Sequence, residues 1–378
     1  SDSSYHHVFF YTAEGRLISR IGANWGSGEY EFKNPSNIVF DPQGALYVAD
    51  RDNHRIQKFI PEIETIETVS QIGGSSKAVA LLNGDTALVW KGAALQVVDI
   101  SVDPPVEIAI TQPTTDNILD IAVYQNTAYA LSEYNGLYIY DVSDPTMPVF
   151  QTLFTLQASD NATDIDIFNG IAYIADGGGG LLIYDLANPL NPRRIGQHWS
   201  HSGVYSVELV QQGANLVAFV LARDFPDNQP ADGWVVALDV TDPANIFEIG
   251  SFDTPGSGEW FSLSGTTLVV ADGMDNTNTP VGVQLVNVTD PAAMLIAGAL
   301  EDFYTFKVEA AGNMAYAIDG DVLYAIDISN PAVPVLVASS GASENDLSNL
   351  TLAGDRVLVT DYSAGLRIFD ISGLPALP

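Results

Sequence analysis

The chain of 378 residues carries 14 basic and 47 acidic residues, a formal net charge of -33, and no cysteine. This charge excludes nucleic acid and bare anionic membrane as favourable partners, because both would be repelled. The absence of cysteine excludes disulfides, thiolate metal sites and thiol catalysis.

The first residues, SDSSYHH, lack the basic and apolar regions of a signal peptide. We expect an extracellular or cell-surface protein whose signal peptide has been removed, because a lysine-poor, acidic chain rich in Asn, Thr, Asp and Gly suits an extracellular medium. No apolar run approaches the ~18 residues of a membrane-spanning helix, so no direct membrane insertion is expected.

The first 60 residues contain short strand-forming runs separated by turn residues, in VFFYTAEGRLISRIG and NPSNIVFDPQGALYVADRDNHRIQKF. From Lys77 onward a second pattern recurs, as in GLYIYDVSDPTMPVF and DVLYAIDISNPAVPVLV. An apolar strand ends in an acidic position, and a Pro-bearing turn and another strand follow. That position falls, at intervals of 40 to 54 residues, on Asp99, Asp141, Asp185, Asp239, Asn287, Asp327 and Asp370. Such a period predicts stacked supersecondary units.

Each unit contains four short strands. Between Asp116 and Leu156 they read NILDIAVYQN, TAYALS, GLYIYDVS and VFQTLFTL. Four-stranded antiparallel units of this length predict a β-propeller, in which each sheet buries its faces against its neighbours. No segment shows a sustained helical period with caps, so helices should be nearly absent.

The predicted fold is therefore all-β, a single propeller domain over 1–378 with eight four-stranded blades closed by pairing N- and C-terminal strands. Closure removes open sheet edges. A seven-bladed ring with loose terminal strands is the alternative. In the eight-bladed ring VFFYT is a surplus strand. It either adds to the outside of the eighth blade or pairs with another molecule, which would produce self-association. The predicted blades span 34–74, 76–114, 116–157, 160–200, 203–255, 258–302, 303–343, and 345–378 with 6–22.

IDISNPAVPVLV and its siblings resemble the LVIVD repeat of bacterial and archaeal surface or secreted propellers, over about Lys77 to Ile371. The earlier segment resembles an NHL repeat. Its pattern positions are occupied by Pro35, Gly44, Tyr47, Asp50, Asn53, His54, Arg55 and Ile56. NHL repeats also form propeller blades, so the two resemblances together imply one propeller.

The turns after the second strands share a face with the connections between blades, around the mouth of the channel. Five of eight second strands end in Asp, so the mouth should be electronegative. One interpretation is that these residues attract a cation such as Ca2+, the only cofactor the sequence suggests. The competing interpretation is that each Asp accepts the amides of its own turn. The candidate metal ligands are Asp50, Asp176, Asp272, Asp319 and Asp361.

The blade junctions supply aromatic residues that could stack on sugar rings or anchor a partner's loop. The same residues could instead fill space between the inner strands. His198 and His201, three residues apart, would need a third ligand to hold a metal. The candidate ligand-binding residues are Trp199, His201, Tyr205, Trp260 and Tyr304.

The sequence contains no HExxH, GxSxG or GxxxxGK motif, so no catalytic residues are assigned and an enzyme is not favoured. The NHL resemblance permits a metal-dependent lyase or lactonase, but the five histidines do not assemble such a site. We expect a secreted or cell-surface binding or scaffold module for a protein or glycan partner. The alternatives are a filament or layer subunit assembled by terminal strand exchange, and a metal-assisted hydrolase or lyase at the channel mouth.

Overall fold

The computed structural model divides the chain into two compact units, Ser1–Ile63 and Glu64–Pro378. Apart from one 3-10 turn, η1 (Arg51–Asn53), every described element is a β-strand, which confirms the all-β prediction. No helix among the described residues is long and apolar enough to cross a membrane. The described residues are 8–11, 17–21, 32–40, 46–59, 64–114, 116–156, 161–199, 203–224, 232–275, 277, 279–301, 303–342, 347–362 and 364–374.

The N-terminal unit contains a hairpin and a three-stranded sheet. Strands β1 (Val8–Tyr11) and β2 (Leu17–Ile21) pair antiparallel with each other. The second sheet has the order β3 (Pro35–Phe40), β4 (Leu46–Asp50) and β5 (Arg55–Phe59). The prediction that residues 17–22 would complete a C-terminal blade is therefore wrong, because β2 pairs with β1 and the position beside the last C-terminal strand is taken by Thr68–Ile72.

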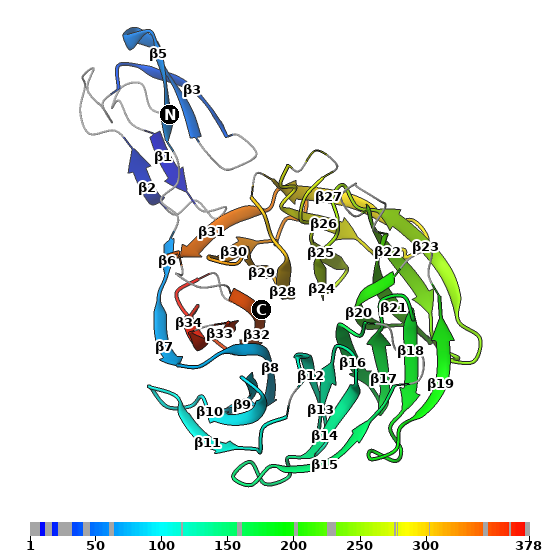
Figure 1. Ribbon diagram of the computed structural model, residues 1–378. Coiled ribbons are helices and arrows are strands. Elements are labelled where there is room, and N and C mark those ends of the chain that lie inside the picture. The colour runs from blue at the N-terminus through cyan, green and yellow to red at the C-terminus, as the bar shows by residue number, and fades with distance from the viewer. Residues whose placement is uncertain are drawn as a thin grey trace. The chain divides into compact units, whose positions relative to one another are not determined.

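The second unit holds seven sheets that follow one another around a ring, each with its first strand innermost (Figure 1). Five sheets are formed entirely by consecutive strands. They are β8 (Ser76–Asn83), β9 (Thr86–Lys91), β10 (Ala94–Asp99) and β11 (Val106–Ile110); β12 (Ile118–Tyr124), β13 (Thr127–Ser132), β14 (Gly136–Asp141) and β15 (Val149–Phe154); β16 (Asp164–Phe168), β17 (Ile171–Ala175), β18 (Leu181–Asp185) and β19 (Arg193–His198); β20 (Gly203–Gln212), β21 (Asn215–Asp224), β22 (Asp232–Asp239) and β23 (Phe247–Asp253); and β24 (Trp260–Ser264), β25 (Thr267–Ala271), β26 (Val283–Asn287) and β27 (Leu295–Leu300).

The last two sheets each take a strand from the start of this unit. The sixth contains β28 (Lys307–Ala311), β29 (Met314–Ile318), β30 (Leu323–Asp327) and β31 (Val335–Ser340), and β6 (Glu64–Ile66) adds to β31 in parallel. The seventh contains β32 (Leu347–Ala353), β33 (Arg356–Asp361), β34 (Gly365–Asp370) and β7 (Thr68–Ile72). The innermost strands contact one another in sequence, and β32 contacts β8, which closes the circle.

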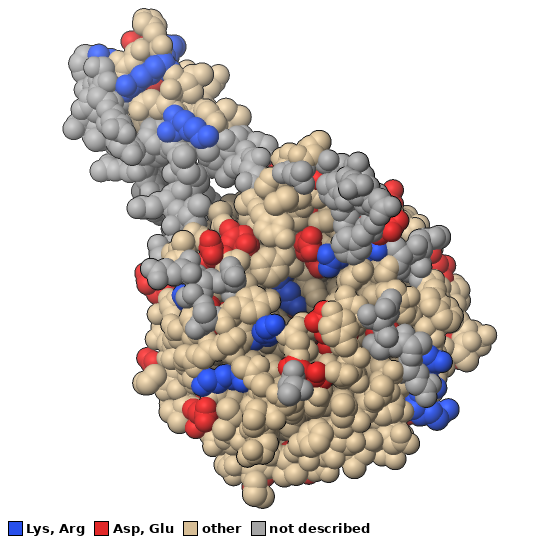
Figure 2. Space-filling view, viewed as in Figure 1, with Lys and Arg blue, Asp and Glu red and all other residues tan. Residues whose placement is uncertain are grey.

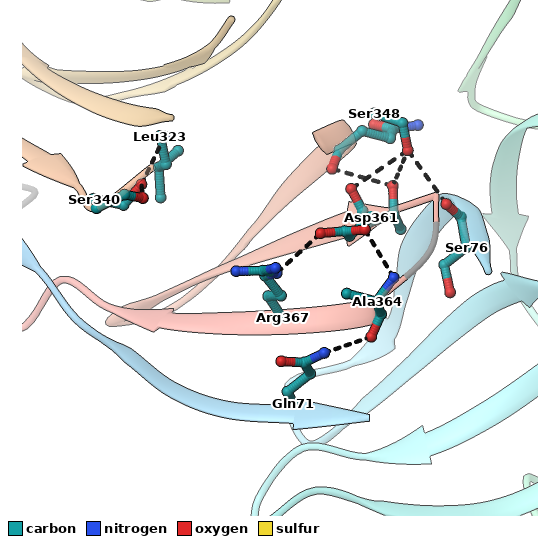
Figure 3. Close-up of polar contacts among 11 residues, drawn as sticks. Gln71, Ser76, Leu323, Ser340, Ser348, Asp361, Ala364 and Arg367 are labelled. Carbon is teal, nitrogen blue, oxygen red and sulfur yellow. Dashed lines mark hydrogen bonds and ion pairs between the residues drawn. The ribbon is translucent and has the colours of Figure 1, made fainter. Parts of the chain in front are cut away.

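Ring closure depends on β7, which pairs antiparallel with β34 (Figure 3). The Gln71 side chain donates a hydrogen bond to the Ala364 carbonyl at 2.7 Å, and the Ser348 hydroxyl donates one to the Ser76 carbonyl at 3.3 Å. A propeller closed by pairing N- and C-terminal strands is thus confirmed.

The number of blades and the domain limits differ in part from the prediction. Seven blades encircle the axis, which is the predicted alternative, and they occupy Glu64–Pro378 rather than the whole chain. The eighth sheet of blade type, β3–β4–β5, lies in the N-terminal unit with three strands. The physical reason is that β7, which was expected to complete this sheet, pairs with β34 instead.

The core lies between adjacent blades. Middle strands such as β13 and β18 are apolar on both faces and almost fully buried. The clusters that they form join one blade to the next, as Tyr129 and Ile139 of one blade pack with Ile174 and Leu182 of the following blade. Burial on both faces explains why these strands read as continuous apolar runs.

The repeated acidic residue closes a turn. The carboxylates of Asp141, Asp185 and Asp327 accept the backbone N–H two residues later, at 2.9, 2.9 and 2.8 Å. The carboxylate of Asp239 accepts the Thr241 N–H in the same way. This is an Asx turn, so the hallmark of the repeat is structural.

Candidate functional site

Three of the five aspartates predicted to bind a metal accept hydrogen bonds within their own turn, namely Asp50, Asp319 and Asp361. One oxygen of Asp319 accepts the N–H groups of Asp321 and Val322, and the other accepts the Tyr324 hydroxyl at 2.6 Å. Asp361 accepts the Ala364 N–H at 2.8 Å and pairs with the Arg367 guanidinium at 3.0 Å (Figure 3).

Like Asp361, the other three aspartates, Asp50, Asp176 and Asp272, are fully buried. Asp50, in the N-terminal unit, accepts hydrogen bonds from Asn53 and Arg55 at 2.8 and 2.9 Å. Burial raises its pKa, but these hydrogen bonds and that of the Lys33 amide outweigh burial and lower the pKa overall. Asp176 begins the turn whose Gly180 carbonyl accepts its N–H.

Asp272 holds the connection that enters the fifth blade. Its carboxylate accepts the Gly256 N–H at 3.0 Å and the Gly258 N–H at 3.1 Å. Burial raises the pKa of Asp272 to about 7 even though these amides favour the charged form. The connection is therefore fixed before any ligand arrives.

The contacts of Asp50, Asp319 and Asp361 agree with the interpretation that the aspartate secures its own turn, whereas Asp272 secures the connection before the first strand of its blade. Within the described ranges, no group of three His, Cys, Asp or Glu residues could hold a metal ion. His201, which was predicted to bind a ligand, lies outside the described residues. Binding of Ca2+ therefore stays a prediction.

Four residues from neighbouring blades converge at the mouth, and we call Tyr205, Arg223, Glu259 and Tyr304 the mouth cluster. The Arg223 guanidinium stands 4.6 Å from the centre of the Tyr205 ring and donates to a Glu259 carboxylate oxygen at 2.6 Å. Burial, followed by the nearby Glu259 charge, raises the pKa of Tyr304. The predicted residue Tyr205 thus contacts a charge pair that was not predicted, and the predicted residue Tyr304 lies close enough to that pair to sense its charges.

The Glu259 carboxylate is held from two sides. Its second oxygen accepts the Ser257 hydroxyl at 2.7 Å, and the Arg223 guanidinium also donates to the Glu259 backbone carbonyl at 3.2 Å. The ion pair is only partly exposed, with 14% and 23% of the two side chains accessible. The mouth cluster is therefore largely preorganised.

Trp199 follows β19 and is 65% exposed, so its ring is available to solvent. The adjacent turn requires glycine at position 180. Gly180 has a left-handed φ of +79°, and the Cβ of any other residue there would meet the His198 carbonyl. Gly177 of the same turn pairs with Val204, immediately before Tyr205. One glycine-rich turn therefore lies beside the connection that carries both Trp199 and Tyr205.

Trp260 lines the axial channel rather than the rim. The channel is a cavity of about 360 Å³ whose lining comes from all seven innermost strands. Figure 2 shows the hollow at the centre of the ring, with both charge types around it. The Lys307 ammonium stands 2.9 Å from the centre of the Trp260 ring.

The channel wall is strongly acidic. Alternate residues of an innermost strand face the same side. The tier nearer the mouth consists of Asp120, Asp164, Ser206, Trp260, Lys307 and Asn349, and the next tier, two residues further along each strand, contains Ala122, Asp166, Glu208, Glu309 and Thr351. Five carboxylates thus surround one ammonium.

Part of this acidity is structural. The Asp164 carboxylate accepts the Val207 N–H at 2.8 Å and the Ser206 hydroxyl at 3.0 Å, and Asp120 accepts the Ile165 N–H at 3.2 Å. The inner edge of each blade would otherwise leave backbone N–H groups unpaired. A carboxylate of the preceding blade satisfies them.

The crowded acids resist ionisation. Burial raises the pKa of Asp166 to about 6 and that of Glu309 to about 7. Burial and neighbouring carboxylates raise the pKa values of Asp164 and Glu208. Burial lowers the pKa of Lys307, although the surrounding carboxylates oppose this effect.

The sequence interpretation missed these channel residues because it examined the ends of the second strands. A detectable signal lies in the first strands, where charged and apolar residues alternate in DIDIF, SVELV and KVEAA. On a strand buried between blades, charged residues at every second position indicate that one face of the strand is exposed to solvent in the channel.

Comparison with known repeats supports this architecture. Residues 32–59 match the NHL repeat, and residues 117–155, 160–197 and 304–340 match the LVIVD repeat. Three segments of the chain are thus similar to the LVIVD repeat and one is similar to the NHL repeat, as expected for a propeller built from repeats of these types. No curated protein matches it.

Solved structures show the same fold at low identity. The Pan2 WD40 domain of Neurospora crassa has a TM-score of 0.59 at 9% identity, covering 84% of this chain and 98% of that one. The computationally designed Ika8 protein has a TM-score of 0.55 at 10% identity, covering 81% of this chain and 100% of that one. At such identities the likeness concerns the fold alone.

Proposed function

We propose that this protein is a secreted or cell-surface binding module whose channel mouth recognises a protein or glycan partner. Propeller repeat folds of this type generally serve as interaction or scaffold modules. The observation that carries the proposal is the convergence of Tyr205, Arg223, Glu259 and Tyr304 at the mouth, near the exposed ring of Trp199.

The chemistry of this surface suits such a partner. Aromatic and arginine side chains dominate the energetics of binding sites, and aromatic faces stack on sugar rings. The Asp272 contacts and the Arg223–Glu259 pair fix the site in advance, so little conformational entropy is lost when a partner binds. An extracellular location is supported by the absence of cysteine and the net charge of -33.

The test compares mouth variants with a matched variant elsewhere. Trp199→Ala and Arg223→Met alter the mouth, whereas Met147→Ala removes a comparably exposed side chain, 66% accessible, from a turn at the opposite ends of the strands. Labelled proteins are applied to a glycan array and to surface proteins of the producing cells with a cross-linker.

We expect the mouth variants to lose at least tenfold in binding to any ligand that the wild type retains, and Met147→Ala to bind normally. Equal binding by all three variants would refute the mouth as the recognition surface. Fractionation of the producing cells tests the location, and recovery only from the cytoplasm would contradict it.

A further inference from the structure

The axial channel contains more negative charge than the fold requires. Each of Asp120, Asp164 and Asp166 accepts a backbone N–H with one carboxylate oxygen. With all groups ionised, five carboxylates face one ammonium, an excess of four negative charges within a cavity of about 360 Å³. A concave, poorly hydrated acidic wall concentrates cations.

Lys307 is a second and independent observation. It is only 8% exposed, lines the cavity, and carries an ammonium that stands over the Trp260 ring. Among the described residues, no hydrogen bond or ion pair within 4.0 Å involves this ammonium. The channel thus holds an alkylammonium group by an aromatic face and by the more distant carboxylates Asp120, Asp164, Glu309 and Glu208.

The carboxylates are distributed in a way that does not suit a metal ion. Ca2+ needs six to eight oxygen ligands around one point. Within the described chain no three acidic or histidine side chains are grouped closely enough to hold a metal. The acids instead come from β12, β16, β20 and β28, in two tiers about 7 Å apart along the strands. Such spacing fits positive charges that are themselves spaced along a chain.

We propose that the axial channel is a binding site for an organic polycation of the alkylammonium type, with Lys307 as a built-in partial occupant. A second ammonium group would lie deeper than Lys307, beside Asp166, Glu208 and Glu309. The amine comes either from a free polyamine or from a lysine side chain of a peptide. This inference concerns the channel wall and is independent of the partner proposed for the mouth.

Proton release is a consequence of this site. Burial keeps Asp166 and Glu309 partly protonated near neutral pH, with pKa values raised to about 6 and about 7. A bound cation favours the charged carboxylates, so binding expels protons and weakens as the pH falls. The groups that face these acids are Asp120 on β12, Asp164 on β16, Glu208 on β20 and Lys307 on β28.

The experiment is calorimetric titration of the full chain with spermidine, the peptide Gly-Lys-Lys-Gly and CaCl2 at one ionic strength. Glu208→Gln/Glu309→Gln should weaken spermidine binding at least tenfold. Lys307→Met should strengthen it severalfold, because the variant removes a competing charge and frees the Trp260 ring. Glu248→Gln, an exposed acid on the outer strand β23, is the control and should change nothing.

The arms distinguish the sources of the amine. Binding of spermidine alone indicates a free polyamine, and binding of the peptide indicates a partner's lysine; each supports the site. Titrations in two buffers of different ionisation enthalpy should show proton release. The proposal is overturned if neither amine binds, if CaCl2 binds as tightly, or if Glu248→Gln weakens binding as much as the channel variant. Should the double variant fail to fold, the Lys307→Met variant decides: the proposal is supported if this variant binds spermidine more tightly than the wild type and is overturned if it does not.

Discussion

Glu309 lies on the innermost strand β28 and faces the axial channel, where burial raises its pKa from 4.5 to about 7. Nearby Lys307 lowers this pKa and Asp120 raises it, so burial determines the sign. Replacing the residue by Gln leaves an uncharged group of nearly the same shape. The perturbation therefore removes only the ionisation.

The sign follows from proton linkage. The native state holds this proton more tightly than the unfolded chain, so ionisation opposes folding when the pH rises from the unfolded pKa toward the folded one. Each pKa unit corresponds to about 1.4 kcal/mol, and most of the shift lies between pH 5 and pH 8. Over that window the free energy of unfolding of the wild type should fall by about 2 kcal/mol relative to Glu309→Gln.

Urea denaturation of the two proteins at pH 5, 6, 7 and 8 measures this difference. Carboxylates with lowered pKa values, such as Asp50 and Asp141, titrate below this window and do not contribute. The stability difference between variant and wild type should move in favour of the variant as the pH rises. A difference that is constant across the window would show that Glu309 is not held protonated, and the electrostatic account of the channel would fail.

Three further perturbations test the fold and the mouth. Gly365→Ala should lower the free energy of unfolding by more than about 1 kcal/mol, because Gly365 has a φ of +90° and an added Cβ would meet the Ile72 carbonyl of the closing strand. Gly354 is also left-handed but has open space around it, so Gly354→Ala should cost about 1 kcal/mol or less. Chemical denaturation measures both. Equal losses would contradict closure at this position. Phe219→Ala should lower the free energy of unfolding by about 3–5 kcal/mol, since Phe219 is fully buried between two blades. Phe150, on an outer strand, is 48% exposed, so Phe150→Ala should cost far less. Thermal and urea unfolding compare the two variants, and similar losses of stability would count against the interblade core. Asp272→Asn should lower the free energy of unfolding by about 1–3 kcal/mol and weaken the binding of any ligand at the mouth, because an amide offers only one acceptor oxygen to the Gly256 and Gly258 N–H groups. Unchanged stability would show that these hydrogen bonds do not hold the connection.

The strand pattern could be predicted from the sequence because it arises from local constraints on each strand and turn. Middle strands such as IAYIAD must be apolar on both faces, and the repeated acidic residue must close its turn, so both signals recur at a fixed interval. The candidate site was only partly readable. Aromatic junction residues such as Tyr205 and Tyr304 were identified. The charge pair beside them was not, because Arg223 lies at the end of β21 and Glu259 precedes the first strand of the next blade, and the two residues share no motif.

The four-stranded units that need neighbours could be inferred from the residue pattern alone, because burial on two faces makes the middle strands of each unit apolar. The closure of seven blades through β7 could be recognised only in the folded chain, since TVSQI can complete either of two sheets and nothing local distinguishes the pairing edges. The tertiary structure also decided that five acids meet around Lys307, because that meeting depends on the number of blades that share the axis. Local residue patterns specify the units, and the geometry of closure specifies what those units bring together.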